Sequence, residues 1–192
     1  MTSPLCIASD YVARVRGLLA ELDLEAVAAA ASVLLDAYDG GHTVFVCGNG
    51  GSAATASHMA ADLGKNTVAA GRPRLRVLSL NDNMAWFSAL ANDLGYENVF
   101  VEQMENLLQP GDVLVALSAS GNSPNVVRAA EFAKARGGRI LALVGFDGGR
   151  LRGLADVAIH LKCDAYGPIE DAHLVLNHVF TETLRERIRS TP

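Results

Sequence analysis

The pattern of apolar and polar residues changes once along the chain, near residue 41. Before that point, apolar residues recur at helical spacing among many alanines, and the stretch ends in Tyr-Asp-Gly-Gly at 38–41. We therefore expect residues 1–40 to form one long helix or two helices joined near Asp23. After residue 41, short runs of β-branched residues and leucine alternate with stretches of helical periodicity.

This alternation predicts five strands, at 43–47, 75–80, 112–117, 139–144 and 156–161. The helices expected between them are 53–63, 83–94, 98–108, 124–136 and 148–154, and an amphipathic segment at 169–189 follows the last strand. Strands that alternate with helices at this spacing favour right-handed crossovers and a parallel sheet covered on both faces. We predict a three-layer, doubly wound α/β fold with a mainly five-stranded parallel sheet and long terminal helices. The absence of repeats and linkers indicates one domain over 1–192, with an N-terminal helical segment (1–40), an α/β core (41–168) and a C-terminal helix (169–189).

Composition narrows the classes of function. Half of the 192 residues are hydrophobic and the net charge is −5, which argues against disorder and against the basic surface that nucleic acid binding needs. No apolar run approaches the roughly 20 residues that cross a bilayer, and the first residues lack the pattern of a secretory signal, so we expect no membrane partner and a cytoplasmic protein. The three cysteines show no metal-binding or disulfide spacing.

Two loops follow predicted strands and contain mostly small and hydroxyl side chains. The first, 48–54, reads GNGGSAA, and the second, 118–125, reads SASGNSPN. In a parallel α/β sheet, ligands bind beyond the carboxyl ends of the strands, and a helix that starts there offers free N–H groups to an anion. A well-capped turn explains either loop alone, but two at one sheet edge favour a ligand, with phosphate as the expected anion. Lys65 and Arg72 are candidates to balance its charge, and the alternative is that both are solvated surface side chains.

The first loop also comes close to the G-x-G-x-x-G fingerprint of dinucleotide binding. That fingerprint requires an acidic residue about 20 positions later, and the stretch at 68–72 has none. The G-K-[ST] ending of a nucleotide-binding P-loop is also missing. A nicotinamide cofactor or a nucleotide is therefore not expected.

Imidazoles and carboxylates occur at helical spacing in two segments. His58 and Asp62 are four residues apart on the helix after the first loop, and Glu170 and His178 are eight apart on the last helix. Eight residues place two side chains about 80° apart around a helix, so Glu170 and His178 can converge. These four residues can form a metal site or a general acid and base, and they can equally be a surface ion pair and part of an oligomer interface.

Taken together, these segments resemble a known family. GNGGSA at 48–53, His58, AND at 91–93, GDVLVALSASGNSPNV at 111–126, GFDGG at 145–149 and IEDAH through His178 are similar to SIS-domain sugar isomerases of the phosphoheptose isomerase type. The resemblance covers nearly the whole chain. It implies the SIS fold and a homotetramer with active sites at subunit interfaces. It also implies interconversion of sedoheptulose 7-phosphate and glycero-manno-heptose 7-phosphate.

The resemblance also assigns substrate-binding roles. Ser118, Ser120 and Ser123 become the phosphate-binding hydroxyls, and Ala119 stands where many relatives have threonine, so its backbone N–H alone remains as a donor. The first loop then lines the sugar through Asn49, Gly50, Gly51 and Ser52.

The family's zinc site, formed by His, Glu, Gln and His, maps onto His58, Asp62, Glu170 and His178. Two positions depart from the pattern, because Asp62 is one methylene shorter than glutamate and Glu170 replaces a neutral amide. A divalent metal is expected, with Zn²⁺ first and Mn²⁺ or Fe²⁺ favoured somewhat more than usual by the added carboxylate.

The resemblance predicts an aldose–ketose isomerase that acts on a seven-carbon or a shorter sugar phosphate and transfers a proton through a cis-enediol with the help of the metal. We assign Asp62 as the first choice of base and His178 as the acid, with Glu170 as a substitute base. The alternative is a non-catalytic phosphosugar-binding or scaffolding SIS protein, similar to the replication-initiator-associating proteins. The two histidines favour the enzyme, and the changes at 62 and 170 favour the alternative.

Overall fold

The computed structural model, which describes residues 2–190, contains a five-stranded sheet in the order β2-β1-β3-β4-β5. All its strand pairs are parallel. The strands are β1 (Thr43–Cys47), β2 (Arg76–Ser79), β3 (Val113–Ser118), β4 (Arg139–Val144) and β5 (Val157–His160). The predicted fold class and the five strands are confirmed. The three central strands are buried on both faces, as their continuous apolar sequences indicate.

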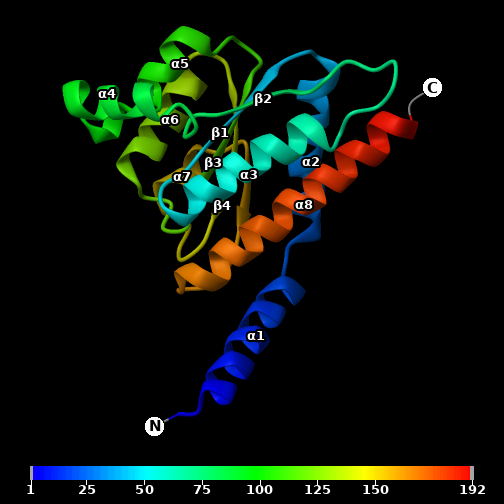
Figure 1. Cartoon of the computed structure of the whole chain (residues 1–192), viewed down its shortest axis with the longest axis vertical. Coiled ribbons are helices and arrows are strands. Elements are labelled where there is room, and N and C mark those ends of the chain that lie inside the picture. Colours follow the sequence, from blue (N-terminus) through cyan, green and yellow to red (C-terminus); the bar gives the residue numbers. More distant parts are fainter. Residues whose placement is uncertain (1, 191–192) are drawn as a thin grey trace.

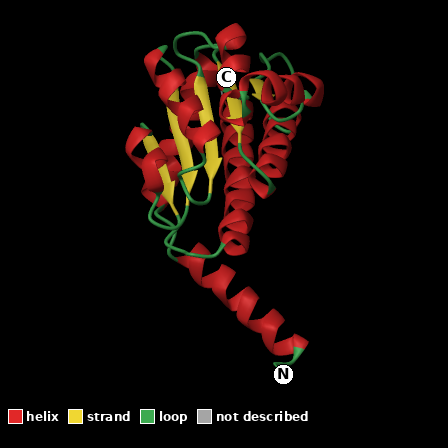
Figure 2. Ribbon diagram, turned by 90° about the vertical axis from the view of Figure 1, so that its left-hand side faces the viewer, coloured by secondary structure: helices red, strands yellow, loops and turns green. Residues whose placement is uncertain are grey.

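Helices cover both faces of the sheet (Figure 2). One face packs against α2 (Leu24–Asp39), α3 (Gly51–Lys65) and α8 (Tyr166–Ser190), with a core that includes Leu34, Met59 and Phe180. The other packs against α5 (Val101–Leu107), α6 (Pro124–Ala135) and α7 (Gly149–Leu154), with a core that includes Phe100 and Met104. This arrangement places α3 and α8 side by side on one face (Figure 1).

The N-terminal segment forms two helices, α1 (Pro4–Ala20) and α2, and not one. They separate where Asp23 adopts an extended conformation and its side chain accepts a hydrogen bond from the Ala26 N–H, which caps α2. Helix α1 projects away from the rest of the molecule (Figure 1). Tyr11 attaches it to the first turns of α8, because its hydroxyl donates a hydrogen bond of 2.6 Å to Asp171.

Two other elements differ from the expected ones. Helix α8 begins at Tyr166 and not at 169, because Pro168 is compatible with the first turn of a helix. The helix expected at 98–108 is a short 3₁₀ turn (Tyr96–Asn98) followed by α5, and α4 (Met84–Leu94) precedes it.

Within the described residues, no helix combines the length and the apolar character that crossing a bilayer requires.

Candidate active site

Two histidines and one aspartate meet between α3 and α8. The Nε2 atom of His58 lies 3.2 Å from Oδ2 of Asp62, and Nε2 of His178 lies 3.6 Å from the same oxygen. The two imidazole rings are edge to face, with centroids 5.3 Å apart. The sequence places His58 and Asp62 one turn apart on α3, and the parallel packing of α8 against α3 brings His178 to them.

Both oxygens of the Asp62 carboxylate accept hydrogen bonds from amides. Asn66, which caps the C-terminus of α3, donates to Oδ1 at 2.8 Å, and Asn177 of α8 donates to Oδ2 at 2.9 Å. Asp62 is mostly buried, whereas His58 and His178 are about half exposed. The carboxylate is therefore fixed from two sides, and the imidazoles form the open side of the cluster.

The geometry of this cluster fits a divalent metal ion. One ligand atom from each of His58, Asp62 and His178 lies within 4.8 Å of the others. Donors that lie about 2.0–2.2 Å from a tetrahedral ion are about 3.3–3.6 Å apart, which matches the two separations of 3.2 and 3.6 Å. Two imidazole nitrogens and one carboxylate are a donor set that zinc accepts while a fourth position stays open.

Glu170 lies outside this group of three residues. Its carboxylate packs against Gly51, where a Cβ atom would come within 2.2 Å of Oε2 and 2.5 Å of Cδ. Glu170 and His178 are eight residues apart, which separates their Cα atoms by about 12 Å along the helix. Glu170 thus faces the first turn of α3, where the free N–H groups and the helix dipole favour a negative charge.

The first glycine loop is held by asparagine side chains. Asn81, which follows β2, binds the backbone of Gly48 twice: its amide donates to the carbonyl at 2.9 Å and its oxygen accepts from the N–H at 3.2 Å. Asn49 and Asn125 exchange two amide hydrogen bonds of 2.8 Å, and Tyr96 donates to the Asn49 oxygen at 2.9 Å. This network connects the loop after β1 to the loop after β3.

The second loop places its hydroxyls at the start of α6. The hydroxyls of Ser118 and Ser123 are 3.2 Å apart, and the Ser123 side chain does not cap the helix, so both can turn toward an anion. Ser120 accepts from the Asn122 N–H at 3.2 Å. Ala119 is buried against Leu18 and Ile169 and offers only its backbone, and its carbonyl binds the Gly145 N–H.

A cleft of about 680 Å³ opens beside the second loop. Its walls come from the loops that follow β3, β4 and β5 and from the start of α8, and they include Ser120, Asn122, Asp147, Lys162 and Tyr166. These loops follow the carboxyl ends of the strands, where a doubly wound sheet binds its ligands. The cleft therefore lies between the serine loop and the first residue of α8, and its lining includes neither Glu170 nor His178.

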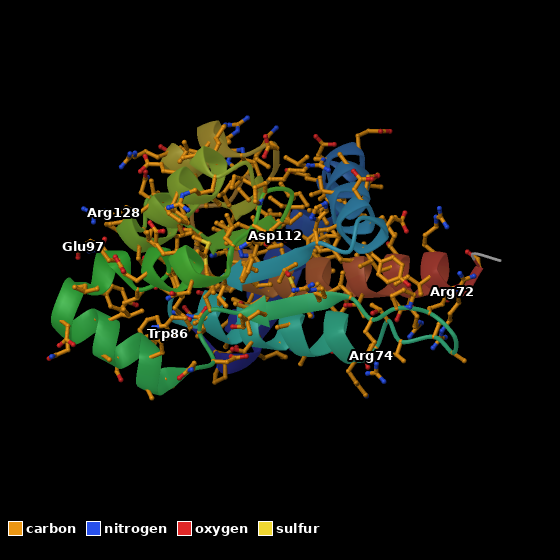
Figure 3. The ribbon with its side chains drawn as sticks, turned by 90° about the horizontal axis from the view of Figure 1, so that it is seen from above. Arg72, Arg74, Trp86, Glu97, Asp112 and Arg128 are labelled. Atoms are coloured by element: carbon orange, nitrogen blue, oxygen red, sulfur yellow. The ribbon has the colours of Figure 1, made fainter. Side chains whose placement is uncertain are left out.

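Two predicted phosphate partners lie away from this edge within the chain. Lys65 is exposed at the end of α3, about 20 Å along the helix from Ser52. Arg72 lies with Arg74 on the loop before β2. Figure 3 shows both on the opposite side of the molecule from Arg128, which belongs to α6, the helix that follows the serine loop. Among the described residues, the hydroxyls and N–H groups of the serine loop remain candidate anion donors, and Lys162 lines the cleft beside them.

Sequence reasoning assigned no role to several residues of this site. Asn177 precedes His178 and Asn66 follows Lys65, but a pattern of helical positions does not show that both amides reach Asp62. The position of Asn81 could have indicated a role in the site, because this residue directly follows a predicted strand. Tyr96 carried none, because its contact with Asn49 depends on how the chain folds between β2 and β3.

Comparison with known proteins identifies the family. The family model described as SIS domain matches residues 10–145. The chain belongs to the SIS domain family. It is 42% identical over 187 residues to the lincomycin biosynthesis protein LmbN of Streptomyces lincolnensis, covering 92% of this chain and 68% of LmbN. It is 39% identical over 178 residues to the phosphoheptose isomerase of Chlorobaculum tepidum, covering 92% and 85% of the two chains.

A solved structure supports the same grouping. The phosphoheptose isomerase GmhA from Neisseria gonorrhoeae superposes with a TM-score of 0.85 at 30% identity, covering 94% of this chain and 97% of that one. This SIS-domain chain therefore lies among the phosphoheptose isomerases in both sequence and fold, as its motifs predict.

Proposed function

We propose that this SIS-domain protein is a ketose–aldose isomerase that interconverts sedoheptulose 7-phosphate and glycero-manno-heptose 7-phosphate. The observation that carries the proposal is the cluster of His58, Asp62 and His178 beside a glycine loop, in a chain similar to phosphoheptose isomerases over most of its length. The cluster supplies acid–base groups and metal donors, and the serine loop supplies an anion site.

The substrate would lie along the carboxyl edge of the sheet. Its phosphate would bind the hydroxyls of Ser118, Ser120 and Ser123 and the N–H groups of the loop before α6. The sugar would then extend along Asn49, Gly50, Gly51 and Ser52, where glycines allow close approach to the backbone. This path runs from the serine loop to the first turns of α3.

His58, Asp62 and His178 would hold a divalent ion, with Zn²⁺ as the first choice and Mn²⁺ or Fe²⁺ as alternatives. When bound, such an ion polarises the carbonyl and hydroxyl oxygens of the sugar. A carboxylate of the chain, Asp62 or Glu170, moves a proton between two sugar carbons by way of a cis-enediol, and His178 is the candidate acid. Glu170 is not among the three converging donors and its carboxylate lies against Gly51, so our proposal does not count it as a metal ligand.

We also propose a homotetramer. Helix α1 exposes Leu5, Ile7 and Val12, and α4 has no buried residue and exposes Met84. Apolar helices that one chain leaves uncovered are typical of subunit interfaces, and homo-oligomers favour closed symmetry. Because Tyr11 joins α1 to the first turns of α8, an interface on α1 would lie close to Glu170.

A non-catalytic phosphosugar-binding protein is the second candidate. The separation of Glu170 from the histidine cluster is the observation that favours it, because three donors and not four converge among residues 2–190. Proton NMR of the purified protein with sedoheptulose 7-phosphate, with and without Zn²⁺, Mn²⁺ or Fe²⁺, tests both. An isomerase produces aldose signals in at least one metal-loaded sample. If the sugar phosphate binds but no sample converts it, the binding protein is supported and the isomerase is refuted.

A further inference from the structure

We propose that Asn66 and Asn177 are positioning residues that hold Asp62 as a metal ligand, and that Glu170 is the catalytic base. Asp62 would then bind the metal and Glu170 would move the proton, two roles that Asp62 alone could otherwise fill. The part on Asp62 concerns metal binding alone, and the part on Glu170 rests on the proposed isomerase function. The observations are the two amide hydrogen bonds to Asp62 and the position of Glu170 against Gly51.

The two amides fix the direction of the Asp62 carboxylate. Asn66 binds Oδ1 from the end of the same helix, and Asn177 binds Oδ2 from α8, so the side chain cannot rotate without losing a hydrogen bond. Oδ2 remains the atom nearest to both imidazole nitrogens. Hydrogen bonds from a second layer of residues orient metal ligands in this way and strengthen metal binding.

The burial of Asn177 indicates that its position is specific. The residue is fully buried, its amide nitrogen binds Asp62, and its side-chain oxygen has no protein partner among the described residues. A buried amide oxygen without a partner is unfavourable, so leucine would be the more stable choice for packing alone. The contact with Asp62 is the interaction that compensates.

A carboxylate held in this way is a poor base for a substrate carbon. A base that moves a proton between two carbons must approach both of them, and the oxygens of Asp62 are committed to two amides and face two imidazoles. Glu170 has no such restraint. Its longer side chain is half-buried and lies against Gly51, in the loop that we expect to line the sugar.

The proposed proton transfer is balanced without a further reactant. Glu170 takes a proton from C1 of the ketose, the electron pair of that C–H bond becomes the C1=C2 bond of the enediol, and the C2 carbonyl oxygen gains a proton from the acid, for which His178 is the candidate. Glu170 then returns its proton to C2 while the C1 hydroxyl gives its proton back to that acid, so that C1 becomes the aldehyde. No proton or electron is gained or lost overall, and the carboxylate is regenerated.

The first experiment measures metal affinity. Zn²⁺ is titrated calorimetrically into metal-free wild type, N177L, N66A, E170Q and D62N, and thermal melting of each apo form checks the fold. We expect N177L and N66A each to weaken Zn²⁺ binding about 10–100-fold, D62N to weaken it further, and E170Q to bind within about 3-fold of wild type. N177L changes a buried residue and could fail to fold. N66A tests the same role without altering the core, because Asn66 is only half-buried.

Thr181→Val is the matched control. Thr181 lies one turn after Asn177 on the same face of α8, is buried, and has a hydroxyl without a protein partner among the described residues. T181V therefore changes buried polarity near the site without touching Asp62, and its Zn²⁺ affinity should equal that of wild type. If N177L and N66A also bind Zn²⁺ like wild type, or if wild type binds none, the role given to Asn66 and Asn177 is wrong.

The second experiment measures proton transfer in the same variants. NMR in D₂O follows isomerisation of sedoheptulose 7-phosphate and deuterium entry at its C1, and E170Q should lose both about 10³-fold while it keeps Zn²⁺. An active E170Q, or one that loses Zn²⁺ as D62N does, overturns the assignment of Glu170. If wild type binds Zn²⁺ in the expected pattern but neither isomerises nor exchanges, the isomerase function and the role of Glu170 fail. The role of the two asparagines then stands.

Discussion

Gly51→Ala tests the position of the Glu170 carboxylate with a single methyl group. The added Cβ would lie 2.2 Å from Oε2 and 2.6 Å from Oε1 of Glu170, far inside van der Waals contact, so the carboxylate must retreat by about 1 Å. A displacement of that size at a reacting group is associated with losses of about 10²-fold, or about 2.7 kcal/mol in the activation barrier. We expect kcat to fall by about that factor.

The same substitution should not destabilise the protein. Gly51 is the first residue of α3 and has no left-handed backbone conformation, so alanine there favours the helix by up to about 1 kcal/mol. Activity and melting temperature should therefore change in opposite directions. Gly153→Ala is the control, because its Cβ would meet no atom within 4 Å. If kcat of G51A stays within about 3-fold of wild type, or if only KM rises, Glu170 does not act from this position.

Three further outcomes are expected. Replacing Ser120 and Ser123 together with alanine should raise KM, by about 1–3 kcal/mol for each charge-assisted bond lost, and an unchanged KM in steady-state kinetics would remove the phosphate assignment. Light scattering should show a tetramer, and Leu5→Glu with Val12→Glu should dissociate it, because both side chains are exposed on α1. Burial lowers the pKa of His173 to about 4 from its ordinary 6.5, so the unfolded chain binds a proton that the folded chain does not between these values. Urea unfolding of the apo protein should therefore show about 3 kcal/mol less stability at pH 4 than above pH 6.5, a loss that His173→Phe removes.

The sheet was predictable because each strand is an apolar run that stands out from its surroundings. Strands β3 and β4 are buried along nearly their whole length, and turn residues mark their ends. The break between α1 and α2 was left open, because leucines and alanines continue the helical spacing across it. Only the capping hydrogen bond from Ala26 to Asp23 decides it.

The candidate site was predictable where it depends on spacing within one element. His58 and Asp62 are neighbours on any helix, and the structure brings His178 to them. The separation of Glu170 from this group was also predictable, because eight residues advance about 12 Å along a helix, but the angle around the helix alone suggested that Glu170 and His178 converge. The amides of Asn66 and Asn177 escaped prediction because contacts between helices depend on the offset of α8 along α3.

Asp62 and Glu170 stand where the family pattern has glutamate and glutamine. The effects of substituting these two residues should depend on each other, and a double-mutant cycle measures that dependence. Asp62→Glu pushes the carboxylate one methylene beyond the reach of Asn66 and Asn177, so the single variant should bind Zn²⁺ less tightly. Glu170→Gln alone should remove the base. In the double variant, the longer side chain at 62 is free of the amides and can again serve as a base, so activity should partly return. We expect kcat of the four proteins to deviate from additivity by at least about 1 kcal/mol. Strict additivity would mean that the two carboxylates act independently, and the division of roles would then be wrong.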